Sequence, residues 1–178
     1  SSKTMRDDLY LLRDFLAYLE TIEAVRPWLS EAVDIPDLDD GDGVKHYDLD
    51  PERVWETDQH LNQYSHGSKE HVTFRLLSRT GIRRGALVGI DTDDIHLGDE
   101  PYIEVRHREG ETRLKNGPDG EREVAIRDDT AQLLQDYLDN VREETTDEFG
   151  RDPFLPGRNG RISGSTIQNY VYRVTRPC

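Results

Sequence analysis

One stretch, residues 101–127, alternates apolar and polar side chains, whereas the other regular parts of the chain repeat with a helical period. The segments "YIEVRHR" and "REVAI" alternate, and "ETRL" and the turn-rich "KNGPDGE" lie between them. Alternation with a period of two is typical of half-buried strands, and Asn-Gly and Asp-Gly steps favour tight turns. The stretch therefore predicts a small three-stranded antiparallel sheet in a mainly helical protein of α+β class.

Helices are predicted on both sides of this sheet. Apolar residues at three- and four-residue spacing indicate helices over residues 4–23, 51–65, 68–79 and 82–88 before it, and over 128–146 and 163–176 after it. Pro27 is expected to begin a further short helix, because proline suits the first helical position. Asp50 is placed to cap the helix that follows it, and Gly81 is placed to end a helix in the left-handed conformation.

An acidic linker divides the sequence. Residues 34–51, "DIPDLDDGDGVKHYDLDP", are rich in Asp, Gly and Pro and have no apolar period, which indicates a linker. We therefore expect helices of one domain over residues 1–36, an acidic linker over 37–50 and a second domain over 51–178. Two helices make a poor domain, so residues 1–36 are interpreted as the end of a helical domain.

Composition excludes several classes of protein. The sequence has no run of eighteen apolar residues and no signal-peptide pattern, so we expect no membrane partner. The only cysteine is Cys178, which indicates a reducing, cytoplasmic compartment. There is no Gly-rich phosphate loop with a following lysine. His60, His66 and His71 do not share a helical face, so no cofactor and no metal are expected.

The net charge of −14 argues against a nucleic-acid partner, but the distribution of the charges along the sequence does not. Residues 1–70 carry 7 basic and 17 acidic side chains, whereas residues 151–178 carry 5 and 1. Such asymmetry can leave one cationic face on an acidic protein. The acidic excess also suits concentrated salt, which screens self-repulsion, so we expect a halophilic source. The alternative is an ordinary acidic cytoplasmic protein.

Two adjacent arginines lie in the otherwise apolar segment "TGIRRGALVGI", residues 80–90. Burying a guanidinium is costly unless an anion pairs with it. We expect Arg83 to be buried in this helix. Its partner is either a phosphate or one of the nearby carboxylates of Asp91, Asp93 and Asp94.

The order of these motifs resembles the catalytic domain of the tyrosine recombinases, the phage-integrase family of site-specific enzymes that break and rejoin DNA. The resemblance is greatest to members from halophilic archaea and runs from about Val44 to Cys178. It is carried by "TGIRRGALVGIDTDDI", the lone lysine in "RLKNGPDGEREVAI", an acidic helix, the "PFLPG" loop and the basic "STIQNYVYRVTRPC". It implies double-stranded DNA as partner, a homo-tetramer on two sites and no metal or nucleotide cofactor. Residues 1–36 would be the last helices of the family's core-binding domain.

The resemblance implies two catalytic residues. Arg83 matches the arginine that holds the scissile phosphate, and Lys115 matches the hairpin lysine that protonates the leaving 5′ oxygen. A bidentate arginine stabilises charge that develops on the non-bridging oxygens, and a lysine can act as general acid. Arg84 is interpreted as a neighbour that contacts the DNA backbone or lies on the surface.

This sequence departs from the family in two places. Ala86 stands where the family usually has an acidic residue that orients the arginine, so another carboxylate such as Asp91 is expected to do so. No His-x-x-Arg follows residue 107, and the family's tyrosine nucleophile comes after that box. Tyr170 and Tyr172 precede that point and are interpreted as core or backbone-contacting residues. We therefore expect a recombinase truncated at both ends that binds DNA without completing strand exchange.

The final helix and the loop before it supply the other candidate DNA contacts. Hydroxyls and arginines at a helix N-terminus suit phosphate, and the polar face of the helix could enter a major groove. The alternative is a solvated amphipathic helix. Two other functions stay open: a non-catalytic DNA-binding regulator or integrase remnant, and an interaction protein whose arginines pair internally. The candidates are Arg84, Arg158, Arg161, Ser163, Ser165, Thr166, Asn169 and Arg173.

Overall fold

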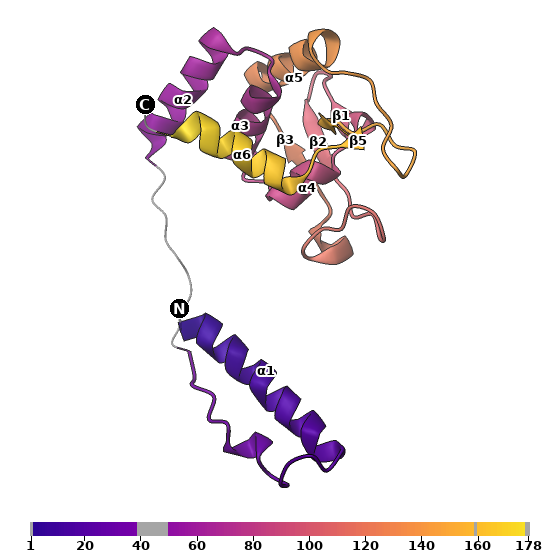
Figure 1. The fold of residues 1–178 in the computed structure, drawn as a ribbon. Helices are drawn as coiled ribbons and strands as arrows, with labels where there is room; N and C mark the ends of the chain where they lie inside the picture. Colours follow the sequence, from indigo (N-terminus) through magenta and orange to yellow (C-terminus); the bar gives the residue numbers. More distant parts are fainter. Residues whose placement is uncertain (1, 39–49, 159, 177–178) are drawn as a thin grey trace. The chain divides into compact units, whose positions relative to one another are not determined.

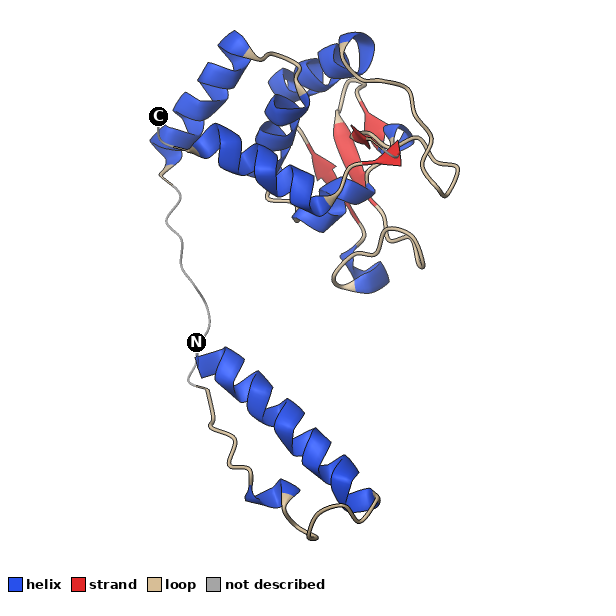
Figure 2. Cartoon of the chain, viewed as in Figure 1, coloured by secondary structure: helices blue, strands red, loops and turns tan. Residues whose placement is uncertain are grey.

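The computed structural model describes residues 2–38, 50–158 and 160–176 (Figures 1 and 2). It divides the chain into two compact units, residues 1–48 and 49–178. Most of the predicted acidic linker, residues 39–49, and Cys178 lie outside the described residues. Within the described parts, no helix is both long and apolar enough to span a membrane.

The first unit is a helix and a returning segment. Helix α1 (Ser2–Thr21) matches the predicted amphipathic helix, but it buries no side chain within this unit. The helix predicted to begin at Pro27 is wrong, because only the 3₁₀ turn η1 (Ser30–Ala32) follows. Trp28 has a φ of 72°, which a right-handed helix cannot include. The Glu20 carboxylate accepts a 2.6 Å hydrogen bond from Ser30 N and fixes the return.

Five helices build the second unit: α2 (Pro51–Tyr64), α3 (Lys69–Thr80), α4 (Arg84–Gly89), α5 (Asp128–Asn140) and α6 (Gly164–Thr175). The ends predicted at Asp50 and Gly81 are confirmed, whereas α5 ends at Asn140, earlier than the predicted 146. The side chain of Asp50 accepts from Glu52 N and that of Ser163 accepts from Thr166 N. Gly81 ends α3 with a φ of 63°, a conformation that glycine adopts without steric cost.

The predicted three-stranded antiparallel sheet is confirmed, with the order β1 (Ile95–His96), β2 (Tyr102–Val105), β3 (Arg122–Ala125). Only two of its strands lie in residues 101–127. The segment 111–114 is no strand, because Arg108 N bonds to Thr112 O in a local turn. Residues 106–121 thus form a long β2–β3 connection that ends in the 3₁₀ helix η3 (Gly117–Gly120). Strands β4 (Pro156–Gly157) and β5 (Gly160–Arg161) make a separate hairpin.

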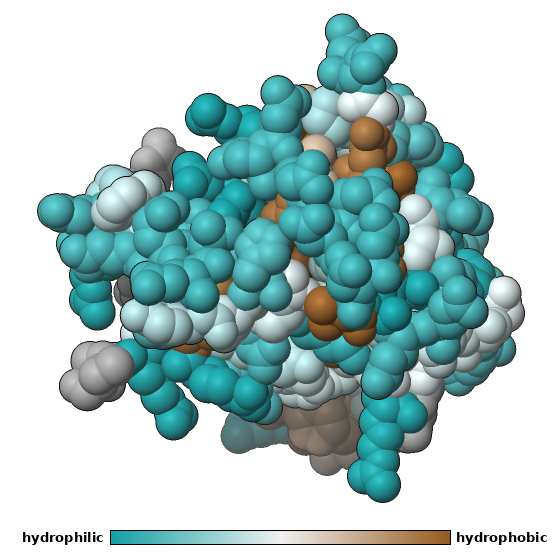
Figure 3. All heavy atoms as spheres, turned by 90° about the horizontal axis from the view of Figure 1, so that it is seen from above, coloured by the Kyte–Doolittle hydropathy of each residue, from teal (hydrophilic) through white to brown (hydrophobic). Residues whose placement is uncertain are grey.

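The core of this unit lies between α3, α4, α5, α6 and the sheet. Its centre is Tyr137, fully buried, with its ring edge-on to Phe154 and its hydroxyl donating to Phe154 O at 3.1 Å. Buried side chains of α4, α6 and β2 belong to the same core cluster. The other members with the least exposure include Val72, Leu76, Leu87, Ile103, Leu134 and Ile167. By contrast, the face shown in Figure 3 is mostly hydrophilic, with small separate apolar patches.

Candidate nucleic-acid interface

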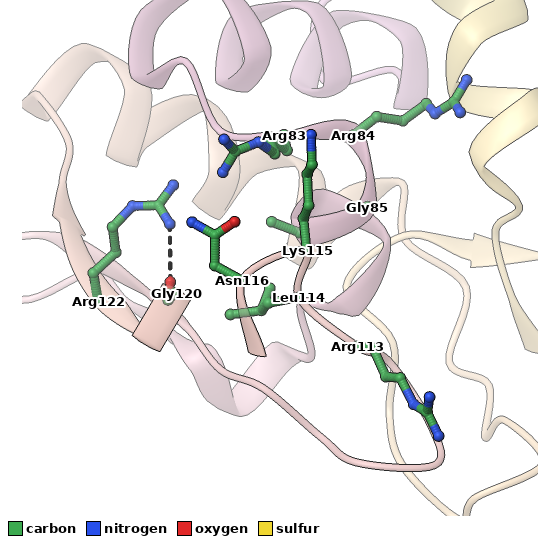
Figure 4. A pocket seen from close by; sticks show the side chains of 10 residues that line it. Arg83, Arg84, Gly85, Arg113, Leu114, Lys115, Asn116, Gly120 and Arg122 are labelled. Carbon is green, nitrogen blue, oxygen red and sulfur yellow. Dashed lines mark hydrogen bonds between the residues drawn. The ribbon is translucent and has the colours of Figure 1, made fainter. Parts of the chain in front are cut away.

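A cationic pocket of about 350 Å³ opens between the start of α4 and the β2–β3 connection (Figure 4). The two walls come from different parts of the sequence and meet only in the folded unit. Five of the ten lining residues are basic and none is acidic, so the pocket is electrostatically suited to an anion. The lining residues are Arg83, Arg84, Gly85, Ala86, Arg113, Leu114, Lys115, Asn116, Gly120 and Arg122.

Arg83 lies at the N-cap position of α4, with extended backbone angles. Its side chain is exposed, so the prediction that it is buried is wrong. The reason is its position: the apolar face of α4 begins only at Ala86 and Leu87, which are buried. Among the described residues, no hydrogen bond or ion pair engages the Arg83 guanidinium. Its five N–H donors are therefore available to a ligand in the pocket.

Lys115 comes from the other wall. It follows Leu114, whose side chain packs against the core and whose backbone N–H donates to His107 Nδ1 at 3.0 Å. The ammonium group is exposed, and within the described chain it has no hydrogen-bond or ion-pair partner. In Figure 4 its side chain extends towards Arg83, so the two residues singled out as catalytic share one pocket.

Asn116 and Arg122 also belong to this pocket, although the sequence analysis did not select them. In Figure 4 both side chains point into the space occupied by the ends of Arg83 and Lys115. Arg122 opens β3 and pairs in register with Val105, the last residue of β2. It therefore lies where the connection carrying Lys115 leaves the sheet. One of its nitrogens donates to Gly120 O at 3.0 Å, which orients the guanidinium. The sequence signal that could have identified Arg122 was its position at the end of a predicted strand, next to the predicted hairpin.

Arg84 and Arg113 line the pocket but diverge from its centre (Figure 4). Arg84 points to α6, where its Nη1 donates to Gln168 Oε1 at 2.6 Å. The approach is close, since a Cβ on Gly164 would lie 3.2 Å from Arg84 Nε. Arg84 thus joins the cationic pocket to the N-terminal end of α6.

Asp91 does not orient Arg83, contrary to the prediction. Its carboxylate is buried in a network of ion pairs that links α4, the β2–β3 connection and residues 147–153. Arg151 Nη1 lies 2.9 Å from Asp91 Oδ2, and Arg108 Nη2 lies 3.1 Å from the same oxygen. Asp94 is similarly engaged by Arg108 at 2.9 Å. Of the three carboxylates proposed as internal partners of Arg83, Asp91 and Asp94 therefore pair with other arginines, whereas Asp93 is exposed.

Arg161 is one of those cations, and its predicted contact with DNA is not supported by its surroundings. Its side chain is 9% exposed, and its guanidinium pairs with Asp91 and with Asp147 at 2.8 Å. It also donates to the carbonyls of Val88 at 2.8 Å and Ile90 at 3.1 Å, which end α4. Burial raises the pKa of Asp147, but backbone N–H groups and Arg161 outweigh burial and hold that pKa below its ordinary value. We therefore remove Arg161 from the candidate contacts.

The remaining candidates lie along α6 and in the β4–β5 turn. Ser163 caps the helix, and its hydroxyl lies 2.9 Å from those of Ser165 and Thr166. Arg158 and Asn169 are exposed. Arg173 is exposed too, but it pairs with Glu70 at 2.8 Å. The structure therefore gathers the hydroxyls at one helix end and places Arg173 near the other.

Neither tyrosine of α6 is arranged as a nucleophile. Tyr170 is half-buried against the core, and burial, followed by the nearby Glu70 carboxylate, raises its pKa. A raised pKa disfavours the phenolate. Tyr172 is exposed, and its hydroxyl accepts a 2.8 Å hydrogen bond from Gln168 Nε2. No group of three or more His, Cys, Asp and Glu side chains in the described residues could hold a metal ion.

Comparison with known proteins identifies the fold. No protein-family model and no curated protein sequence matches the chain. Among solved structures, the chain is similar to one described as the crystal structure of XerA recombinase, with a TM-score of 0.57 and 20% identity. The match covers 93% of this chain and 52% of that chain, so this chain spans about half the length of the recombinase it matches. The two share an α+β fold in which helices surround a small antiparallel sheet.

Proposed function

We propose that this chain acts in site-specific DNA recombination and that its cationic pocket holds a phosphodiester of double-stranded DNA. One observation carries the proposal: Arg83 and Lys115, both without a partner among the described residues, meet in one pocket on a fold shared with a recombinase. Phosphate is the anion that such a pair suits, because a guanidinium forks onto two oxygens while an ammonium acts as a point charge.

The proposed chemistry is phosphoryl transfer through a 3′-phosphotyrosyl intermediate. A tyrosine oxygen bonds to phosphorus as the bond to the 5′ oxygen breaks. Arg83 stabilises the charge on the non-bridging oxygens, and Lys115 gives its proton to the leaving 5′ oxygen. No His-x-x-Arg follows residue 107, and Tyr170 and Tyr172 are not placed as nucleophiles. We therefore propose that these residues bind and polarise the phosphate, while cleavage needs groups that this sequence does not contain.

The surface beside the pocket extends the proposed contact with DNA. Arg84, already held against α6, links the pocket to the hydroxyl cluster at the α6 N-terminus. Backbone contacts of this kind position a duplex without reading its sequence. The proposed contact residues are Arg84, Arg158, Ser163, Ser165, Thr166, Asn169 and Arg173. We further propose residues 1–36 as core-binding helices, a tetramer as the active assembly and a halophilic source.

The test is the affinity of the full chain for a labelled duplex, measured by fluorescence anisotropy at several KCl concentrations. We expect Arg83→Ala and Lys115→Ala each to weaken binding and to lower the salt slope by about 1, the loss of one phosphate contact. Arg127→Ala is the matched control. Arg127 is exposed and follows the C-terminal end of β3, whereas Arg122 lies at the N-terminal end. The Arg127→Ala variant should therefore bind the duplex with the affinity of the wild type.

Two other results would point elsewhere. If the chain binds duplex DNA but Arg83→Ala and Lys115→Ala bind as tightly as the wild type, the pocket is not the phosphate site and a non-catalytic DNA-binding module is favoured. If no duplex is retained at any KCl concentration, the chain is an interaction protein and the proposal is wrong.

A further inference from the structure

The β2–β3 connection, residues 106–121, has no strand to hold it, yet it must present Lys115 to the pocket. Its first turn is held by charges: Arg108 pairs with Asp94 at 2.9 Å and donates to Gly89 O at 3.0 Å. Arg151 contacts the returning limb through Thr112 Oγ1 at 3.3 Å. Neither Arg108 nor Arg151 contacts the residues on either side of Lys115.

His107 supplies the contact that does. Its Nδ1 accepts the Leu114 N–H at 3.0 Å, and its own backbone N–H donates to Glu121 Oε1 at 2.8 Å. A backbone amide can only donate, so Nδ1 carries no proton and the neutral ring has its proton on Nε2. His107 therefore links the residue before Lys115 to the residue before Arg122, and both of those cations line the pocket.

Leu114 transmits this contact because it has little freedom of its own. Its side chain packs against the core, and its carbonyl accepts from Gly117 N at 3.0 Å. A Cβ on Gly120 would lie 3.3 Å from the Leu114 side chain, so the connection is closely packed there. Fixing the Leu114 amide therefore fixes the backbone from which Lys115 extends.

We propose that His107 is a positioning residue that holds Lys115 in the cationic pocket. The role in DNA binding rests on the function proposed above, whereas the link from His107 to Leu114 does not.

Charged groups of both signs adjoin His107. The Glu121 carboxylate accepts its backbone N–H, and Arg106 and Arg108 flank it in the chain. Arg113 and Lys115 flank Leu114. Any test must therefore leave these surrounding charges unchanged, which a comparison of two uncharged substitutions achieves.

The test uses amide hydrogen exchange of Leu114 in the full chain, measured by NMR, together with duplex affinity by anisotropy. His107→Asn offers an acceptor oxygen near the position of Nδ1, whereas His107→Leu offers none. We expect the Leu114 amide to be protected from exchange in the wild type and in His107→Asn, and to lose that protection in His107→Leu.

Duplex affinity should follow the same order. At about pH 8, His107→Leu should bind roughly threefold to tenfold more weakly than the wild type, the effect of one net hydrogen bond. His107→Asn should bind like the wild type. His96→Leu is the control, because His96 is a half-buried histidine in β1 whose Nε2 lies 3.1 Å from Glu104 Oε1 and not near Leu114. It should leave Leu114 protection unchanged.

The possible failures are distinct. Equal Leu114 protection in the wild type and His107→Leu overturns the positioning role. If Leu114 responds but the Leu and Asn variants bind duplex equally, the contact does not position Lys115. If the wild type binds no duplex, the proposed function fails while the Leu114 result stands. Should His107→Leu not fold, a Leu114 amide that exchanges without protection in the wild type also overturns the proposal.

Discussion

Removing the charge of Asp91 should destabilise the second unit strongly. The carboxylate side chain is 8% exposed and faces Arg108 at 3.1 Å, Arg151 at 2.9 Å and Arg161. Asp91→Asn keeps the shape but leaves three largely buried guanidiniums with one anion fewer. Breaking a buried ion pair from one side costs about 3–5 kcal/mol. The arginines keep Asp94, Asp147 and Glu111 as partners, so we expect a loss of about 3 kcal/mol in the free energy of unfolding, the lower end of that range.

Urea unfolding followed by circular dichroism at one fixed KCl concentration measures this loss. With a slope of about 2 kcal/mol per molar urea, the midpoint should fall by about 1.5 M. Asp93→Asn is the matched control, because Asp93 is exposed and should change stability by less than about 0.5 kcal/mol. A midpoint for Asp91→Asn that equals that of Asp93→Asn would refute the view that this network holds α4 and the β2–β3 connection together.

Three further predictions concern pH, salt and the pocket. Burial raises the pKa of Asp58, but His71 at 3.7 Å and Arg75 at 2.6 Å outweigh it and hold the pKa below its ordinary value. Its stabilising contribution is therefore full above about pH 4 and lost as the pH falls through the lowered pKa, and Asp58→Asn should flatten the acid limb of a stability–pH curve. Because the net charge is −14, raising KCl from about 0.1 M to 1 M should raise the melting temperature, and a fall would contradict the halophilic interpretation. Arg122→Ala should lower the salt slope of duplex binding by about 1, whereas Arg127→Ala should not.

The sequence was informative wherever the signal was local. The cap at Asp50 and the left-handed end at Gly81 depend on residues within one turn, and both were predicted. The sheet was predicted from its alternation, but β1 has two residues and is too short to show a period. The helix expected after Pro27 failed because Trp28 takes a positive φ, which no residue pattern indicated.

The site was harder to predict because its arrangement is tertiary. Arg161 lies in a basic segment and was therefore predicted to contact DNA. In the structure its side chain forms ion pairs with Asp91 and Asp147, which are distant in the sequence. Arg83 was expected inside the protein, but the N-cap position places it outside. Arg122 was not selected at all, since only the strand register brings it beside Lys115. Residue types and spacing indicated the chemistry, and long-range packing decided which arginines are available.

The most direct test of the account is to follow the side-chain signals of isotopically labelled arginine and lysine by NMR while a duplex is added. The account predicts that the Arg83 Nε and Lys115 Nζ signals shift on binding, with those of Arg122, while the signals of Arg127 and the buried Arg161 stay in place. If the Arg127 signal shifts while the Arg83 and Lys115 signals stay unchanged, the account is contradicted, because the duplex then lies away from the cationic pocket.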